Sequence, residues 1–190
     1  MRYLVATLAA LLVASPLMAS PTTYRYDTEH SQILFSADHN GYSNPVGRLH
    51  IASGWLRFDM DDWSHAATEL DIDLASVDMG DKTWNAALRA GDFLATGQAR
   101  LAHFVSTSVT RSGPRTGVLH GTLTLRGVSR PLDIAFTLNR EGMTVFGMHT
   151  VIGFSATATL DRDAFGITGN PGSIGHQVHL RLEIEAIREP

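Results

Sequence analysis

Nine histidines are the side chains of this sequence best suited to binding a metal ion, and they are scattered rather than clustered. They lie at positions 30, 39, 50, 65, 103, 120, 149, 176 and 179. His176 and His179 are three residues apart, so on a strand their side chains point to opposite faces. The sequence has no cysteine, which excludes cysteine metal ligands. We predict no metal site, and a site assembled from distant strands stays open as the less favoured alternative.

The candidate catalytic groups are equally dispersed. The run Asp161-Arg162-Asp163 could place two carboxylates around a guanidinium, but such a cluster at a strand end is more typical of a turn held by an ion pair. His30 and Ser31 are sequence neighbours and lie in no Gly-x-Ser-x-Gly frame. The acidic run Asp59-Met60-Asp61-Asp62 lacks the spacing and the glycine of a calcium loop. The sequence therefore does not predict an enzyme.

The first 19 residues have the pattern of a secretory signal peptide. Arg2 precedes an apolar run, and small residues around Ala19 follow it. A membrane-spanning helix needs roughly 20 apolar residues, and Ser15 and Pro16 interrupt this run before that length. We therefore expect residues 1–19 to be a cleaved signal peptide and residues 20–190 to be one exported domain. The expected location is the periplasm, with no transmembrane segment.

Charge and cysteine content narrow the function classes further. Loss of Arg2 with the signal peptide leaves 14 basic side chains against 19 acidic ones, a net charge of −5. An acidic chain does not favour binding to nucleic acid. Without cysteines there is no disulfide framework, so the stability of an exported chain must come from a hydrophobic core. A chain of this size buries roughly 70% of its unfolded surface, which is enough for one such core.

Alternating apolar and polar residues predict most of the structure. In Ala66–Leu74 the even positions are apolar or small, while Glu69, Asp71 and Asp73 alternate with them. In Gly47–Phe58 the apolar parity changes across Gly54, which predicts a bulge or a bend. The other predicted strands are Tyr24–Asp27, Ile33–His39, Ala102–Ser106, Val118–Leu125, Pro131–Asn139, Phe154–Leu160 and Val178–Ala186. Turn signals such as Asn40-Gly41 and Glu141-Gly142 separate them.

One short helix is predicted at residues 82–90, between two strands. Asp81 can cap it, Trp84 and Leu88 share a face, and Gly91 is a natural terminator. Many evenly spaced strands with one apolar face favour a closed sheet, because closure removes exposed edges. The predicted fold is therefore all-β, an extended antiparallel β-barrel of about eight strands with this helix inserted.

Such a barrel is just wide enough either to be filled by its own side chains or to hold one ligand. The residues predicted to face inward mix large and small side chains. Bulky Phe35, Phe58, Phe104, Phe136 and Phe154 alternate with Ala37, Ala66, Thr68, Ala102, Gly121, Ala156 and Ala158. Alternation alone leaves open whether these residues fill the interior or line a cavity.

Several phrases of the sequence, in order and with compatible spacing, resemble the YceI-like family of periplasmic polyisoprenoid-binding proteins. The resemblance covers roughly residues 24–187 and is specific as an ordered set. The phrases are Tyr26-Asp27-x-x-His30-Ser31-x-Ile33-x-Phe35, His39-x-Gly41-x-Ser43-x-x-Val46-Gly47, Gly54-Trp55-Leu56-Arg57-Phe58-Asp59, Leu88-Arg89-Ala90-Gly91-Asp92-Phe93-Leu94, Phe104-Val105-Ser106-Thr107, Gly121-x-Leu123-Thr124-Leu125-Arg126-Gly127-Val128-Ser129-Arg130-Pro131, Leu160-Asp161-Arg162-x-x-Phe165-Gly166-Ile167 and Ile184-Glu185-Ala186.

The resemblance implies a lipocalin-like barrel whose apolar pore holds an isoprenoid or another amphiphilic lipid, often in a homodimer. It implies no catalytic residue and no cofactor other than the bound lipid. The sequence departs from the family at the helix, where Trp84-Asn85-Ala86-Ala87-Leu88 replaces the usual Arg-Asp-x-His-Leu. Gln98-Ala99 likewise replaces a Tyr-Pro pair. If the helix touches the ligand, this member prefers a different one.

Under this hypothesis the lipid contacts nine residues. Phe35, Phe58, Phe104 and Phe154 would line the pore, and Trp84, Leu88 and Phe93 would cover one end. His39 and Asn85 would form a polar mouth. The aromatic residues could equally pack an ordinary core, and His39 and Asn85 could be satisfied turn or cap residues.

A competing hypothesis is a non-catalytic, stress-related or structural envelope protein that acts through protein partners. It would need a solidly packed barrel interior and a large exposed apolar patch. The sequence does not decide between these alternatives.

Overall fold

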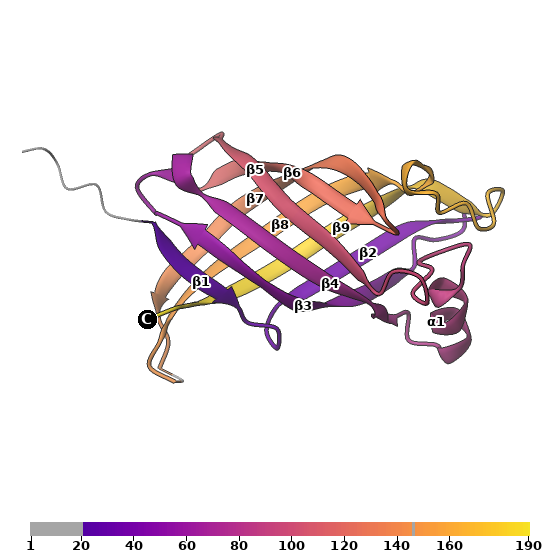
Figure 1. Ribbon diagram of the computed structural model, residues 1–190, viewed down its shortest axis with the longest axis horizontal. Coiled ribbons are helices and arrows are strands. Elements are labelled where there is room, and N and C mark those ends of the chain that lie inside the picture. Colours follow the sequence, from indigo (N-terminus) through magenta and orange to yellow (C-terminus); the bar gives the residue numbers. More distant parts are fainter. Residues whose placement is uncertain (1–20, 146) are drawn as a thin grey trace, which may run out of the picture.

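The protein forms a long closed barrel with a helix at one end (Figure 1). The computed structural model describes residues 21–145 and 147–190, so the predicted signal peptide lies outside the described residues. No helix within those described ranges is long and apolar enough to cross a membrane.

The sheet contains nine antiparallel strands, all joined to neighbours by backbone hydrogen bonds. They are β1 (Thr22–Tyr26), β2 (Gln32–His39), β3 (Val46–Phe58), β4 (Ala67–Asp78), β5 (Leu101–Arg111), β6 (Thr116–Leu125), β7 (Val128–Met143), β8 (Thr150–Asp161) and β9 (Ile174–Arg188). The one α-helix is α1 (Lys82–Arg89), and short 3-10 helices lie at Trp63–His65 and Asp163–Phe165. Pairing of β3 with β4 closes the sheet into a ring.

The ring has eight positions because β1 and β2 share one of them. β1 pairs with β3 and β9 near one end of the barrel, where Thr22 lies opposite Phe58. β2 pairs with the same two strands further along, where Ile33 lies between Leu49 and Leu182. The predicted all-β, eight-stranded closed barrel with one short helix is confirmed.

The alternation of the sequence places the core inside the barrel. On β8, Phe154, Ala156 and Ala158 are all buried, while the residues between them face outward. On β9, Leu182 and Ala186 are buried, and Glu183 accepts a hydrogen bond from Ser155 on the outer face. The alternation of apolar and polar residues along each of these strands therefore matches the alternation of buried and outward side chains.

The parity change on β3 corresponds to an irregularity in the pairing with β4. The register shifts between Ile51 and Ser53, and Gly54 has a φ of 148°. A β-carbon at Gly54 would lie 2.4 Å from the carbonyl oxygen of Glu69. The predicted bulge is confirmed, and Ala52 is the residue without a partner. Gly54, two residues later, must be glycine for both conformation and space.

One local signal in the sequence was wrong, and a second was only partly confirmed. Glu141 and Gly142 do not form a turn, because β7 continues through them and Met143 pairs with Thr150. The helix does end directly before Gly91, with Ala90 as its C-cap, but Gly91 lacks the positive φ of a terminating glycine, and the residue with positive φ in this loop is Ala95. In the first case the ladder with β8 overrides a composition that is typical of turns.

We predict that Gly54→Ala lowers the free energy of unfolding by at least about 2 kcal/mol, because alanine disfavours this φ and its β-carbon meets the Glu69 carbonyl. Urea denaturation measures the change. Gly91→Ala is the matched control, since its β-carbon would meet no atom within 4 Å, and it should change stability by less than about 0.5 kcal/mol. Equal effects of the two substitutions would contradict this account of the bulge.

Candidate ligand-binding cavity

An apolar cavity of about 280 Å³ occupies the α1 end of the barrel. Aliphatic side chains from many strands form its wall, including Ile33, Leu49, Leu74, Leu123 and Leu160. The polar side chains of its lining are Asp38, His39, Arg162, Asn170 and Ser173. Asp38 and His39 end β2, and the other three lie at or beyond the end of β8, so the polar groups gather at one end of an apolar space.

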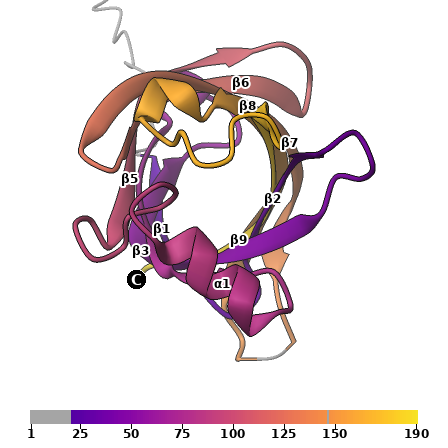
Figure 2. The ribbon, with the colours of Figure 1, turned by 90° about the vertical axis from the view of Figure 1, so that its right-hand side faces the viewer.

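Helix α1 lies along one side of the rim at this end of the barrel, as the end-on view shows (Figure 2). Trp84, Ala87 and Leu88 line the cavity from the helix. The indole of Trp84 meets the imidazole of His39 edge to face, with ring centroids 6.0 Å apart. Trp84 is still 41% exposed, so it lies at the boundary between cavity and solvent. The helix therefore covers part of the cavity, and Trp84 forms its edge toward solvent.

Asn85 does not line the cavity but fastens the helix. Its Oδ1 accepts a hydrogen bond from Met79 N at 2.7 Å, and its Nδ2 donates to Asp78 Oδ1 at 3.1 Å. Asp78 also accepts bonds from Gly80 N and from Arg48. The Gly80 hydrogen bond, followed by those from Asn85 and Arg48, lowers the pKa of Asp78 to about 2. This network ties the start of the cover to the end of β4.

Arg162 holds the second loop at this end. Its guanidinium is almost fully buried and donates to the carbonyl oxygens of Gly175, Ile167, Gly169 and Ile174 at 2.8 to 3.0 Å. The nearest carboxylate oxygen of Asp163 is 4.0 Å away. Hydrogen bonds from Arg162 to backbone carbonyl groups thus hold the turn that follows β8. The ion pair expected from the run Asp161-Arg162-Asp163 contributes less.

The two loops also touch each other. Phe93 packs onto Gly169, where a β-carbon would lie 2.6 Å from the ring. Gly169 N donates to Asp92 O at 3.0 Å. From the turn between β6 and β7, Arg126 donates to carbonyl groups of both loops, at Gly91 and at Gly166. These contacts close part of the barrel end around the cavity.

A second, smaller cavity of about 80 Å³ lies deeper in the same interior. Phe58, Phe104, Phe136 and Phe154 contribute to its lining. Three of them form a cluster with Trp63, with ring centroids 5.2 to 5.8 Å apart. This aromatic cluster fills the end of the barrel opposite α1.

Two consecutive inward residues of the same strand can line different cavities, and the boundary between the cavities lies between them. On β5, Ala102 lines the larger cavity and Phe104 the smaller one. On β4 the corresponding residues are Ile72 and Leu70. Phe104 lies against Gly121, where a β-carbon would be 2.3 Å from its ring. A large aromatic side chain seated on a glycine therefore stands at this boundary.

Polar groups in the wall of the smaller cavity are satisfied within the wall. Tyr26 donates its hydroxyl proton to Thr68 Oγ1 at 2.6 Å, and Thr68 Oγ1 donates to Trp55 O at 2.5 Å. Burial raises the pKa of Tyr26 to about 12, so the phenol stays neutral. A space whose few polar groups already have partners stays apolar.

Asp38, His39 and Ser173 line one cavity, but they do not form a catalytic arrangement. The carboxylate of Asp38 accepts from Gly41 N at 2.8 Å, while the His39 ring contacts Trp84. In the described parts of the chain no hydrogen bond joins these three side chains. A serine nucleophile needs its base within hydrogen-bond reach.

The structure brings five of the nine candidate residues to the larger cavity: Phe35, His39, Trp84, Leu88 and Phe93. Phe58, Phe104 and Phe154 line the smaller one, and Asn85 lines neither. The candidates omitted Met79, Arg162 and Ile167, which also line the larger cavity. Of these, Arg162 and Ile167 stand in the phrase Leu160-Asp161-Arg162-x-x-Phe165-Gly166-Ile167, a signal that could have found them.

Comparison with known sequences assigns this barrel to a family. The profile of the YceI-like domain matches residues 24–186. The chain belongs to the YceI-like family. A UPF0312 protein of Shewanella putrefaciens is 34% identical over 190 residues, covering 99% of both chains. Another, from Shewanella sp. strain ANA-3, is 35% identical over 187 residues, covering 96% of this chain and 97% of the relative.

Solved structures share the fold of this YceI-like chain at low sequence identity. Burkholderia cenocepacia BcnA superposes with a TM-score of 0.75 at 20% identity, covering 85% of this chain and 99% of that one. A polyisoprenoid binding domain from Saccharophagus degradans gives a TM-score of 0.67 at 15% identity, covering 88% and 99%. At these identities the likeness establishes the fold alone.

We predict that Asn85→Ala raises the pKa of Asp78 from about 2 toward its ordinary value of 3.8, because one hydrogen bond to the carboxylate is lost. Since the folded pKa lies below the ordinary one, the network contributes its stability above about pH 4 and loses it as the pH falls toward 2. Carboxyl-carbon NMR titration measures the shift. Asn139→Ala, which removes an amide bonded to Ser155, is the control. An unchanged Asp78 titration would contradict this role of Asn85.

Proposed function

We propose that this protein is an exported carrier that holds an isoprenoid or another amphiphilic lipid inside its barrel. The apolar chain enters the 280 Å³ cavity, and the polar head stays at the α1 end. Phe35, Leu88 and Phe93 contact the chain, while His39 and Trp84 border the mouth. Phe58, Phe104 and Phe154 receive the far end of a longer chain, and Asn85 acts indirectly by positioning the helix.

The single observation that carries this proposal is an apolar cavity whose polar side chains gather at one end. An amphiphile needs this arrangement, because its chain gains from leaving water while its head does not. Each buried methylene contributes about 0.8 kcal/mol, so affinity grows with chain length without any specific polar contact. Membership of a family with a solved polyisoprenoid binding domain supports the same ligand class.

The size of the cavity limits the cargo. Ligand pockets usually enclose about 300 to 1,000 Å³, so a cavity of about 280 Å³ suits a short prenyl or acyl chain. A longer chain must reach the smaller cavity past Phe104. Rotation of that ring away from Gly121 would join the two spaces. The protein therefore binds short chains directly and longer ones after the interior opens.

The proposal gives the barrel no catalytic role. In the cavity lining, Arg162 is engaged with carbonyl groups, and Asp38 accepts from a backbone amide. The cavity also favours a carrier over a structural envelope protein acting through partners, since that alternative needs a packed interior. Periplasmic location rests on the signal-peptide pattern of residues 1–19.

Mass spectrometry of an organic extract tests the proposal. We expect untagged protein recovered from the periplasm to lack residues 1–19 and to carry a stoichiometric prenyl or acyl species. Phe35→Trp should lower the bound amount more than about tenfold, because a larger ring displaces at least two methylenes of the chain.

Leu34→Trp is the matched control for this experiment, because Leu34 is next to Phe35 on β2 but belongs to the outer face. It should leave the bound lipid unchanged. Heat-denatured and washed protein shows the background of adhering lipid. An empty extract with no uptake of offered lipids, or equal effects of the two substitutions, would refute the carrier function.

We also propose that the protein is a homodimer, as its family resemblance implies. Sedimentation velocity of the lipid-loaded protein at micromolar concentrations should give twice the mass of one chain. The mass of a single chain at every concentration would contradict the dimer and leave the carrier proposal untouched.

A further inference from the structure

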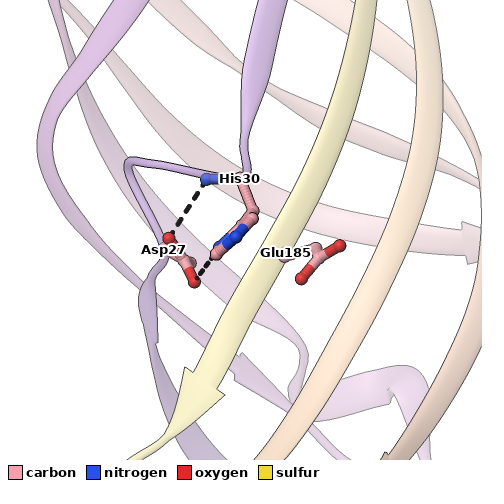
Figure 3. Close-up of side chains that lie close together, drawn as sticks. All are labelled: Asp27, His30 and Glu185. Atoms are coloured by element: carbon pink, nitrogen blue, oxygen red, sulfur yellow. Dashed lines mark hydrogen bonds and ion pairs between the residues drawn. The ribbon is translucent and has the colours of Figure 1, made fainter. Parts of the chain in front are cut away.

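Three side chains on the outer wall of the barrel combine the donor types of a divalent metal site (Figure 3). Asp27 and His30 belong to the loop between β1 and β2, and Glu185 lies on β9. One ligand atom from each, two carboxylate oxygens and one imidazole nitrogen, lies within 4.8 Å of the others. Among the residues that the structure describes, this is the one group of three potential ligands so arranged.

Backbone hydrogen bonds hold the loop and β9 together at this point. Asp27 N donates to Glu185 O at 2.9 Å. The Ser31 hydroxyl donates to Glu185 O at 3.0 Å and accepts from Glu185 N at 3.1 Å. These bonds fix the backbones that carry all three side chains, although they are far apart in sequence. A cation would bind with little reordering of the main chain.

The orientation of Asp27 is also fixed before any ion arrives. Its Oδ1 accepts from Glu29 N and His30 N at 3.0 and 3.1 Å, and its Oδ2 pairs with His30 Nδ1 at 2.8 Å. The Asp27 side chain is only 15% exposed, whereas the His30 ring is 65% exposed. Asp27 is thus held beside an accessible imidazole, and a cation bound by both groups would replace the proton that Oδ2 and Nδ1 share.

The local charge favours a cation. Asp27 and Glu185 bring two carboxylates together, and within the described ranges no arginine or lysine forms an ion pair with either. His30 is the one basic group paired with this cluster. Mixed nitrogen and oxygen donors with room for water suit zinc and neighbouring transition metals better than magnesium.

The other carboxylate–histidine pairs of the barrel lack a third ligand. His65 pairs with Asp62 at 3.1 Å with the same i,i+3 spacing as His30 and Asp27, but no further ligand group completes a triple there among the described residues. Pairs at His103, His120 and His176 are likewise unaccompanied. The contribution of Glu185 from β9 is thus what distinguishes this cluster.

We propose that Asp27, His30 and Glu185 form a zinc-binding site on the outer wall of the barrel, with water completing the coordination. The bound ion clasps the β1–β2 loop to β9. Ile184, the neighbour of Glu185, faces the smaller cavity, so the clasp braces the wall beside the aromatic end. The site does not depend on the proposed lipid cargo.

Isothermal titration calorimetry of tag-free, metal-stripped protein with Zn²⁺ tests this site. One ion per chain should bind, and saturating Zn²⁺ should raise the melting temperature by several degrees. Glu185→Gln and His30→Ala should each weaken binding at least tenfold, while Mg²⁺ should give no comparable shift. Circular dichroism establishes that each variant is folded.

His65→Ala is the matched control, because it removes a histidine with the same aspartate spacing and no third ligand. It should retain wild-type zinc affinity and stoichiometry. Absence of zinc binding in the wild type would overturn the proposal. So would full retention of affinity in folded Glu185→Gln, or an equal loss in His65→Ala, which would indicate dispersed binding by surface histidines.

Discussion

Pairing between β3 and β4 closes the sheet, and the other features of this protein depend on that closure. A closed ring has no edge strand, so every strand has a hydrogen-bonded neighbour on both sides along at least part of its length. Closure also sets the width of the interior, because eight strands leave room for side chains or for one small ligand. The bulge between Ile51 and Ser53 and the positive φ of Gly54 both lie on this closing pair.

Once the width is set, the size of the inward side chains decides where space remains. At one end, Phe58, Phe136 and Phe154 pack with Trp63 and leave a small gap. Toward α1 most inward positions of the strands carry aliphatic side chains and alanines, with Phe35 as the aromatic exception, and a larger cavity remains between them. The smaller number of aromatic rings on the strands toward α1 thus leaves the larger cavity at that end. Its depth ends where Phe104 rests on Gly121.

At the α1 end of the barrel, arginine side chains stabilise the loops that lie beyond the sheet. Loops there lack a ladder of strand hydrogen bonds, and Arg126 and Arg162 donate to their carbonyl groups instead. Arg89 joins α1 to β4 by donating to Ala75 O and Val77 O. A planar guanidinium can reach several carbonyls at once, which a lysine ammonium does less well. Burying Arg162 would be costly without partners, but four carbonyl groups replace its lost hydration. Hydrogen bonds between these guanidinium groups and the carbonyl groups therefore hold the loops around the mouth in place, which apolar side chains alone would not do.

The sequence by itself determined the class of the fold, the inward face of each strand, the bulge near Gly54 and the position of the helix. These features follow from local periodicity and from capping by Asp81, which act over a few residues. Only the tertiary structure decided that Glu141 and Gly142 continue a strand, that Asn85 fastens the helix, and that Phe154 lies in an aromatic cluster instead of the main cavity. It also brought Glu185 beside His30. The physical reason is that such contacts join residues from different strands, and their distances depend on closure and register, which no local pattern encodes.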